Sequence, residues 1–94
     1  MDKKERNDLY LDALVSYGFA NQRMMLVEEV GELLNAIAKH HRGRITDKFE
    51  VITELADVSI MVEQMAEHFG YADFEAEKER KLERLRERLK NKEG

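Results

Sequence analysis

The sequence predicts an all-α protein, a four-helix bundle whose core is completed by oligomerisation. Apolar residues recur three and four positions apart in four successive segments, which places them on one face of a helix in each segment. Gly18, Gly43 and Gly70 separate these segments, and proline, which interrupts helices, is absent. With 94 residues, the chain is expected to form one domain over residues 1–94. A core of this size is marginal alone, so association with further copies would stabilise it.

The first helix is expected over residues 5–17 and ends at Gly18, a residue type common at helix C-termini. A short connection, residues 19–21, is then expected, with Asn21 as the N-cap of the next helix. One face of the first helix is apolar, and it comprises Leu9, Tyr10, Ala13, Leu14 and Tyr17.

The second helix is expected over residues 22–41, where basic residues and Gly43 mark its end. Its core stripe comprises Leu26, Val30, Leu33, Leu34 and Ile37. Glu29 and Glu32 fall on a neighbouring stripe, so these acids border the core rather than oppose it.

The third helix is expected from about Asp47, with Thr46 or Asp47 as its cap, to Phe69. The fourth is expected over residues 73–91, with Asp73 as N-cap. Its apolar stripe comprises Phe74, Leu82, Leu85 and Leu89, and Lys78 falls on the same line. The alternating charges around this stripe are typical of a solvated helix with pairs three or four residues apart.

Two acidic pairs give the strongest functional signal. Glu29 and Glu32, with Glu28 one turn before Glu32, lie on the second helix, and Glu54 and Asp57 share a face of the third. If these helices pack antiparallel, the pairs meet, and converging carboxylates require protonation or a cation. Magnesium prefers carboxylate oxygens and commonly bridges to substrate phosphates.

The alternative is two solvated acidic faces, which we would favour for a single pair because exposed glutamate is common. Two pairs flanked by apolar residues favour the metal site. Lys78 and Lys81 are candidates for contacting phosphates, against the alternative that they serve only solubility. Gln22 is a further candidate substrate-binding residue. Tyr10, Tyr17, Phe19, Met24 and Met25 form a set that could line a base pocket, although such a pattern more often marks core.

Several classes of function are disfavoured. A net charge of -4 argues against nucleic-acid binding, and the apolar runs are too short to span a membrane. Cysteine is absent, so thiolate metal sites are excluded. Neither a Glu-x-x-His nor an HExxH motif occurs, and no glycine-rich phosphate loop is present. The N-terminus lacks the apolar segment of a signal peptide, so a soluble cytoplasmic protein is expected.

The acidic residues resemble a known family signature. Glu28-Glu29-x-x-Glu32 followed by Glu54-x-x-Asp57 looks like the EExxE…ExxD motif of MazG-like nucleotide pyrophosphohydrolases, members of the all-α NTP pyrophosphohydrolase superfamily. The resemblance covers the second and third helices, and the outer helices fit only by pattern. The bipartite motif is fairly specific, although each half alone is weak.

This resemblance implies a homodimer or homotetramer that uses Mg²⁺, with Mn²⁺ as a substitute, to cleave a (d)NTP between the α and β phosphates. It implies Glu29, Glu32, Glu54 and Asp57 as metal ligands, with Glu28 assisting a second metal or water. Tryptophans that stack on the base in some relatives are missing here. The alternatives are a phosphoribosyl-ATP pyrophosphohydrolase of the same fold and a non-catalytic helical interaction module built on the fourth helix.

Overall fold

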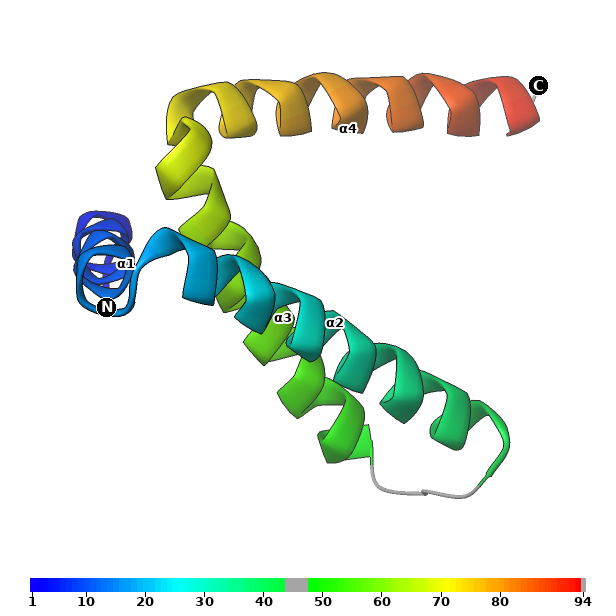
Figure 1. The fold of residues 1–94 in the computed structure, drawn as a ribbon. Coiled ribbons are helices and arrows are strands. Elements are labelled where there is room, and N and C mark those ends of the chain that lie inside the picture. Colours follow the sequence, from blue (N-terminus) through cyan, green and yellow to red (C-terminus); the bar gives the residue numbers. More distant parts are fainter. Residues whose placement is uncertain (44–47, 94) are drawn as a thin grey trace.

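The described part of the chain forms four α-helices (Figure 1). The structure, a computed structural model, describes residues 1–43 and 48–93, and no strand occurs among them. The helices are α1 (Lys3–Tyr17), α2 (Phe19–His41), α3 (Lys48–Phe69) and α4 (Tyr71–Glu93). The predicted all-α class is therefore confirmed.

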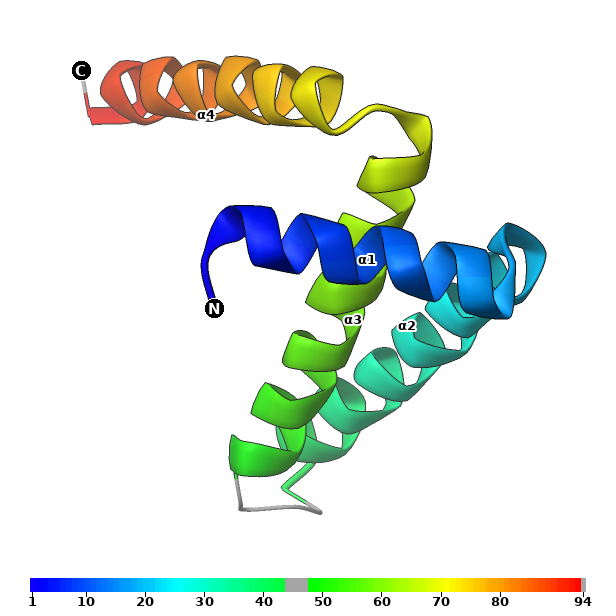
Figure 2. The same cartoon turned by 90° about the vertical axis from the view of Figure 1, so that its left-hand side faces the viewer.

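The helices α2 and α3 run antiparallel, side by side, and form the centre of the molecule (Figures 1 and 2). The helix α1 crosses this hairpin and packs mainly against α3, with a smaller contact to α2. Within the described residues, α4 packs mainly against α3, its first residue Tyr71 also meets Lys3 of α1, whose Nζ lies 5.0 Å from the centre of the Tyr71 ring, and most of its length extends away from the other helices. The hairpin therefore positions the two acidic motifs, and α4 forms a projecting arm.

The corner between α1 and α2 corrects the expected connection. Residues 19–21 form the first turn of α2, and Gly18 alone links the helices, with φ 87° and ψ 143°. This positive φ suits glycine because a β-carbon would be strained there, and it turns the chain within one residue. Asn21 is not an N-cap, because its side-chain nitrogen donates to the Tyr17 carbonyl at 2.8 Å.

The other helix ends are partly as expected. Gly43 has φ 72°, the left-handed conformation expected after α2. Gly70 ends α3 with φ 133°, and α4 begins directly at Tyr71, so the prediction of Asp73 as N-cap was wrong. Asp73 lies inside the first turn of α4 instead. The predicted caps Thr46 and Asp47 lie outside the described residues.

The core is small, as expected for a chain of this length. The buried hydrophobic residues among those described are Tyr10, Ala36, Met61 and Ala66. Two buried polar side chains join α2 to α3, because Gln22 Nε2 donates to Gln64 Oε1 at 2.8 Å. Many large apolar side chains remain exposed, including three leucines of α4, so one chain alone does not bury its apolar surface.

The contact between α1 and α3 includes one partly buried hydrogen bond between side chains. The Tyr10 hydroxyl donates to the half-buried Glu63 carboxylate, and only 6% of Tyr10 is exposed. Burial, reinforced by the bond to Glu63, raises the pKa of Tyr10 to about 12, so the hydroxyl keeps its proton at neutral pH.

We expect Tyr10→Phe to lower the free energy of unfolding by about 1.5–3 kcal/mol, because Glu63 loses its donor while it stays partly buried. Urea unfolding at pH 7 measures this change. Tyr17→Phe is the matched control, since Tyr17 lies on the same helix but is 63% exposed and should change little. Equal effects of the two substitutions would show that the bond to Glu63 does not hold α1 in place.

Candidate metal centre

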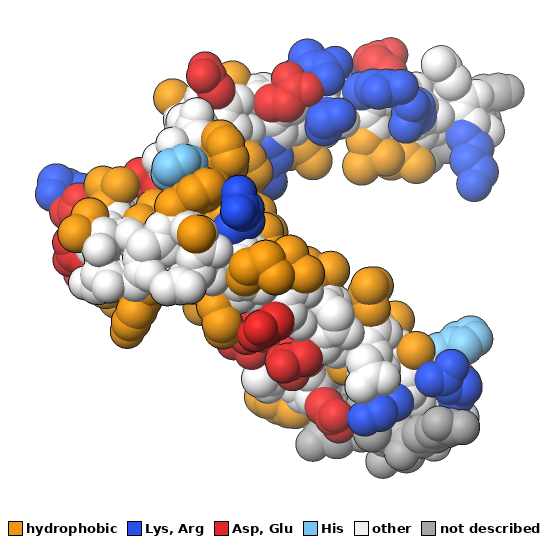
Figure 3. Space-filling view, in the orientation of Figure 1, with side chains coloured by type: hydrophobic (Ala, Val, Ile, Leu, Met, Phe, Trp, Pro, Cys, Tyr) orange, Lys and Arg blue, Asp and Glu red, His pale blue; other side chains and the backbone are white. Residues whose placement is uncertain are grey.

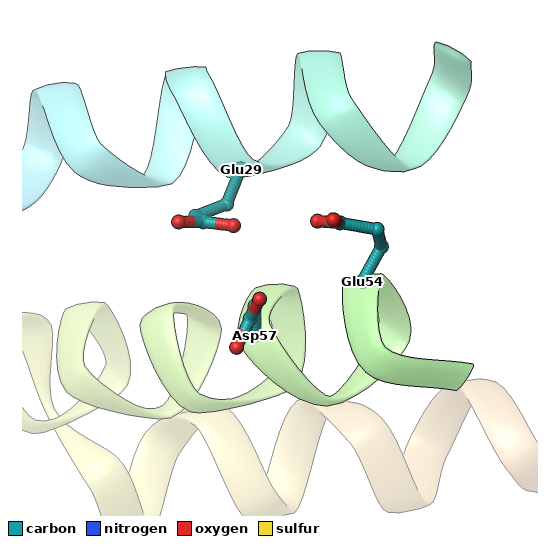
Figure 4. A group of neighbouring side chains, drawn as sticks. All are labelled: Glu29, Glu54 and Asp57. Carbon is teal, nitrogen blue, oxygen red and sulfur yellow. The ribbon is translucent and has the colours of Figure 1, made fainter. Parts of the chain in front are cut away.

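Three carboxylates from two helices meet at the α2–α3 interface (Figure 4). Glu29 extends from α2, and Glu54 and Asp57 extend from successive turns of α3. One oxygen of each lies within 4.8 Å of one oxygen of the other two. The antiparallel hairpin thus brings together acids that are 25 residues apart in the sequence, Glu29 and Glu54.

These carboxylates are half-buried and incompletely paired. The Oε2 atoms of Glu29 and Glu54 are buried and have no hydrogen-bond partner. Buried polar atoms are normally paired, so two unpaired oxygens that point into one cluster suit a ligand that accepts lone pairs.

The electrostatics of the cluster are repulsive. Partial burial, followed by the charges of Glu32, Asp57 and Glu54, raises the pKa of Glu29. Partial burial and the charges of Glu32 and Asp57 likewise raise the pKa of Glu54. A bound cation would remove this repulsion, as would protonation.

The other acidic residues near this group, Glu28 and Glu32 of the first motif and Glu50, occupy different places. Glu32 is exposed, yet it lies close enough to raise the pKa of both Glu29 and Glu54. Glu28 is exposed and does not belong to the group of three. Glu50 also contributes to the raised pKa of Glu54, a role that its position four residues earlier on α3 could have indicated.

The candidate substrate-binding residues lie away from the cluster. Lys78 and Lys81 share one side of α4, where Lys78 Nζ sits 5.6 Å from the centre of the Phe74 ring and Lys81 Nζ is 4.0 Å from Glu77. Among the described residues α4 packs mainly against α3. Gln22 is buried, and its amide nitrogen donates a hydrogen bond to Gln64 Oε1. The structure therefore gathers the acids but not these three residues.

The aromatic residues of the first two helices do not gather into one pocket. Tyr10 packs towards α3 and bonds to Glu63, whereas Tyr17 is exposed. The Phe19 ring stacks on His68, with ring centres 3.6 Å apart. The core interpretation holds for Tyr10 alone of these three.

The donor set fits a hard divalent cation. Mg²⁺ binds oxygens at about 2.0–2.1 Å, so ligands on opposite sides of it lie about 4.2 Å apart. Neighbouring ligands in the octahedron lie closer, at about 2.9 Å. The oxygens of Glu29, Glu54 and Asp57 lie within 4.8 Å of one another, so side-chain rotation would have to bring them closer to bind one ion. Glu32 is exposed, and its charge and a side-chain hydrogen bond with it help to raise the pKa of both Glu29 and Glu54, so it lies next to the group.

Fold and site together define an all-α protein with paired carboxylates across a helical hairpin. The model of one protein family, described as the MazG nucleotide pyrophosphohydrolase domain, matches residues 18–92. The chain therefore belongs to this family, which confirms the resemblance found in the acidic motifs and supports nucleotide pyrophosphohydrolase chemistry at family level. No curated protein and no solved structure matches the chain. No helix in the described ranges combines the length and apolar character that crossing a membrane requires.

The raised pKa values of Glu29 and Glu54 predict how stability depends on pH. Without divalent cations, the folded state binds protons at these sites more tightly than the unfolded state does. The free energy of unfolding should therefore fall as pH rises from about 4.5, the ordinary glutamate value, through the raised values. Urea unfolding in EDTA across this range measures the slope.

The Glu54→Gln substitution should flatten this dependence, because it removes both a titrating group and a charge that acts on Glu29. The matched control is Glu28→Gln, since Glu28 is exposed and lies outside the group of three. If Glu54→Gln keeps the full slope, the cluster is not the source of the pH dependence.

Proposed function

We propose that this protein is a Mg²⁺-dependent nucleoside triphosphate pyrophosphohydrolase that cleaves a (d)NTP to (d)NMP and pyrophosphate. The observation that carries this proposal is the convergence of Glu29, Glu54 and Asp57, two of them with buried unpaired oxygens. Membership of the MazG family supports the reaction class. The proposed assembly is a homodimer or a homotetramer.

In this proposal Glu29, Glu54 and Asp57 hold the cation, and Glu32 completes the set. When bound there, Mg²⁺ supplies positive charge that polarises phosphoryl oxygens and lowers the pKa of water. Mn²⁺ has the same preference for carboxylate oxygens and would substitute. The half-buried position limits competing water around the ligands.

The remaining steps fall to the chain's own residues. Water forms a bond to the α-phosphorus, and the bond between the α-phosphorus and the oxygen that bridges to the β-phosphorus breaks. Glu28, which is exposed beside the cluster, would orient this water and take its proton, and the released pyrophosphate carries away the bridging oxygen. Lys78 and Lys81, exposed on α4, remain the proposed contacts for phosphate, together with Gln22 for substrate.

Pyrophosphate release from a panel of NTPs, dNTPs and phosphoribosyl-ATP, with and without Mg²⁺, tests this proposal. We expect Mg²⁺-dependent release that Asp57→Asn lowers at least about 100-fold, since a loss of about 3 kcal/mol in transition-state stabilisation has that effect. The Asp12→Asn variant is the matched control, because Asp12 is exposed on α1. The melting temperature of metal-free Asp57→Asn should be preserved or raised, since repulsion falls.

Release from phosphoribosyl-ATP alone would identify the substrate as that of the histidine-pathway relative. No release from any nucleotide, together with unchanged behaviour of Asp57→Asn, would favour the helical interaction module instead. The projecting α4 is the observation that keeps this second candidate in view.

Metal binding can be measured separately from turnover. Mg²⁺ at 100 times its dissociation constant should stabilise the wild-type protein by about 2.7 kcal/mol, because it binds only the folded state. Glu32→Gln and Asp57→Asn should each weaken this effect in calorimetric and thermal titrations, whereas Asp12→Asn should not. A full Mg²⁺ response in both cluster variants would remove the basis for the metal centre.

A further inference from the structure

The isolated chain exposes more surface than a compact monomer of its size. Its accessible surface is 7288 Å², whereas a folded monomer of 11.1 kDa exposes about 5,650 Å². The radius of gyration is 16.3 Å, against about 12 Å for a compact domain of this length. The excess surface of about 1,600 Å² is twice the roughly 800 Å² that each partner buries in a standard interface.

Part of this excess lies along α4. Its apolar residues Leu82, Leu85 and Leu89 are each about half exposed, at 51%, 50% and 52%. Figure 3 shows hydrophobic side chains on the side of α4 that faces the other helices across an open hollow. A groove of about 550 Å³ follows this side, and its lining includes Val62 of α3 and Phe74, Leu82 and Leu85 of α4.

The signs of the charges along α4 are arranged about the middle of the helix. Counting outward in both directions from the midpoint between Lys81 and Leu82, every pair of charged residues at equal distance has opposite signs. These pairs are Arg80 with Glu83, Glu79 with Arg84, Glu77 with Arg86, Glu75 with Arg88, and Asp73 with Lys90. At the same spacing Phe74 corresponds to Leu89 and Leu82 lies next to the centre, whereas Leu85 corresponds to Lys78, whose aliphatic stem is the apolar part that it would meet.

Pairs within the helix do not account for this symmetry. Arg80 with Glu77, Arg86 with Glu83 and Lys90 with Glu87 are exposed pairs three residues apart, and such pairs contribute little. Pairs within one helix require opposite charges three or four residues apart. They do not require that residues at equal distances from the midpoint of the helix carry opposite charges. When two identical helices pair antiparallel about a twofold axis, positions at equal distance from that axis become level with each other. Parallel pairing would instead place every charge level with its own copy.

We propose that α4 is a homodimerisation arm that pairs antiparallel with the α4 of a second copy of this chain, centred between Lys81 and Leu82. The two apolar stripes then cover one another along the groove beside Val62, and the opposite charges flank them. The interface is isologous, so both copies use the same residues and every contact occurs twice. This arrangement is independent of the proposed hydrolysis, and it names the surface and the orientation of the assembly.

Single cysteines test the arrangement directly, because the chain has none of its own. In the antiparallel pair, the two copies of position 82 lie nearly level, whereas the two copies of position 89 are offset by about 22 Å along the axis. After light scattering has established the mass of each variant, a short bifunctional thiol reagent should join Leu82→Cys into covalent dimers and leave Leu89→Cys unjoined. Both positions lie on the same stripe and are equally exposed, so they are matched.

Joining at both positions would indicate parallel arms and overturn the proposal. Joining at neither position, or a monomeric mass for the unmodified protein, would overturn it as well. Charge exchange gives a second measurement that leaves the apolar stripe intact. Arg86→Glu should raise the dimer dissociation constant at low salt, and adding Glu77→Arg should restore it at least partly; failure to restore would contradict the pairing.

Discussion

The main constraint on this structure is that the α2–α3 hairpin holds together carboxylates that repel one another. Glu29, Glu54 and Asp57 extend from helices that pack against each other, so the backbone positions of the three acids are fixed by the α2–α3 interface. The hairpin is held by apolar packing beside them and by the buried bond between Gln22 and Gln64. In the proposed metal centre, the cost of bringing the acids together would therefore be met during folding rather than on cation binding.

The other two helices cover the α2–α3 hairpin only in part. Single glycines at Gly18 and Gly70 turn the chain so sharply that α1 crosses the hairpin and α4 leaves it. The few buried apolar residues show that one chain forms little core of its own. The chain exposes about 1,600 Å² beyond a compact monomer, and the proposed pairing of α4 would cover part of it by burying the exposed leucine stripe.

Local pattern predicted the helices well and their junctions less well. Apolar spacing and glycines located all four helices, with ends within three residues of those observed. The expected connection at residues 19–21 and the Asp73 cap were wrong for one reason. Both relied on polar residues as helix starts, whereas Gly18 and Gly70 turn the chain alone and the next helix begins at once.

By itself, the sequence determined the helix periodicity, the acidic pairs on their faces and the family that these motifs indicate, because all three depend on spacing along the chain. Only the tertiary structure decided which carboxylates meet, that the Gln22 amide is occupied by Gln64, and that Lys78 and Lys81 lie on a separate arm. Spacing along one helix follows from its backbone geometry. The distance between residues on different helices depends on corner angles and packing, which no local pattern records.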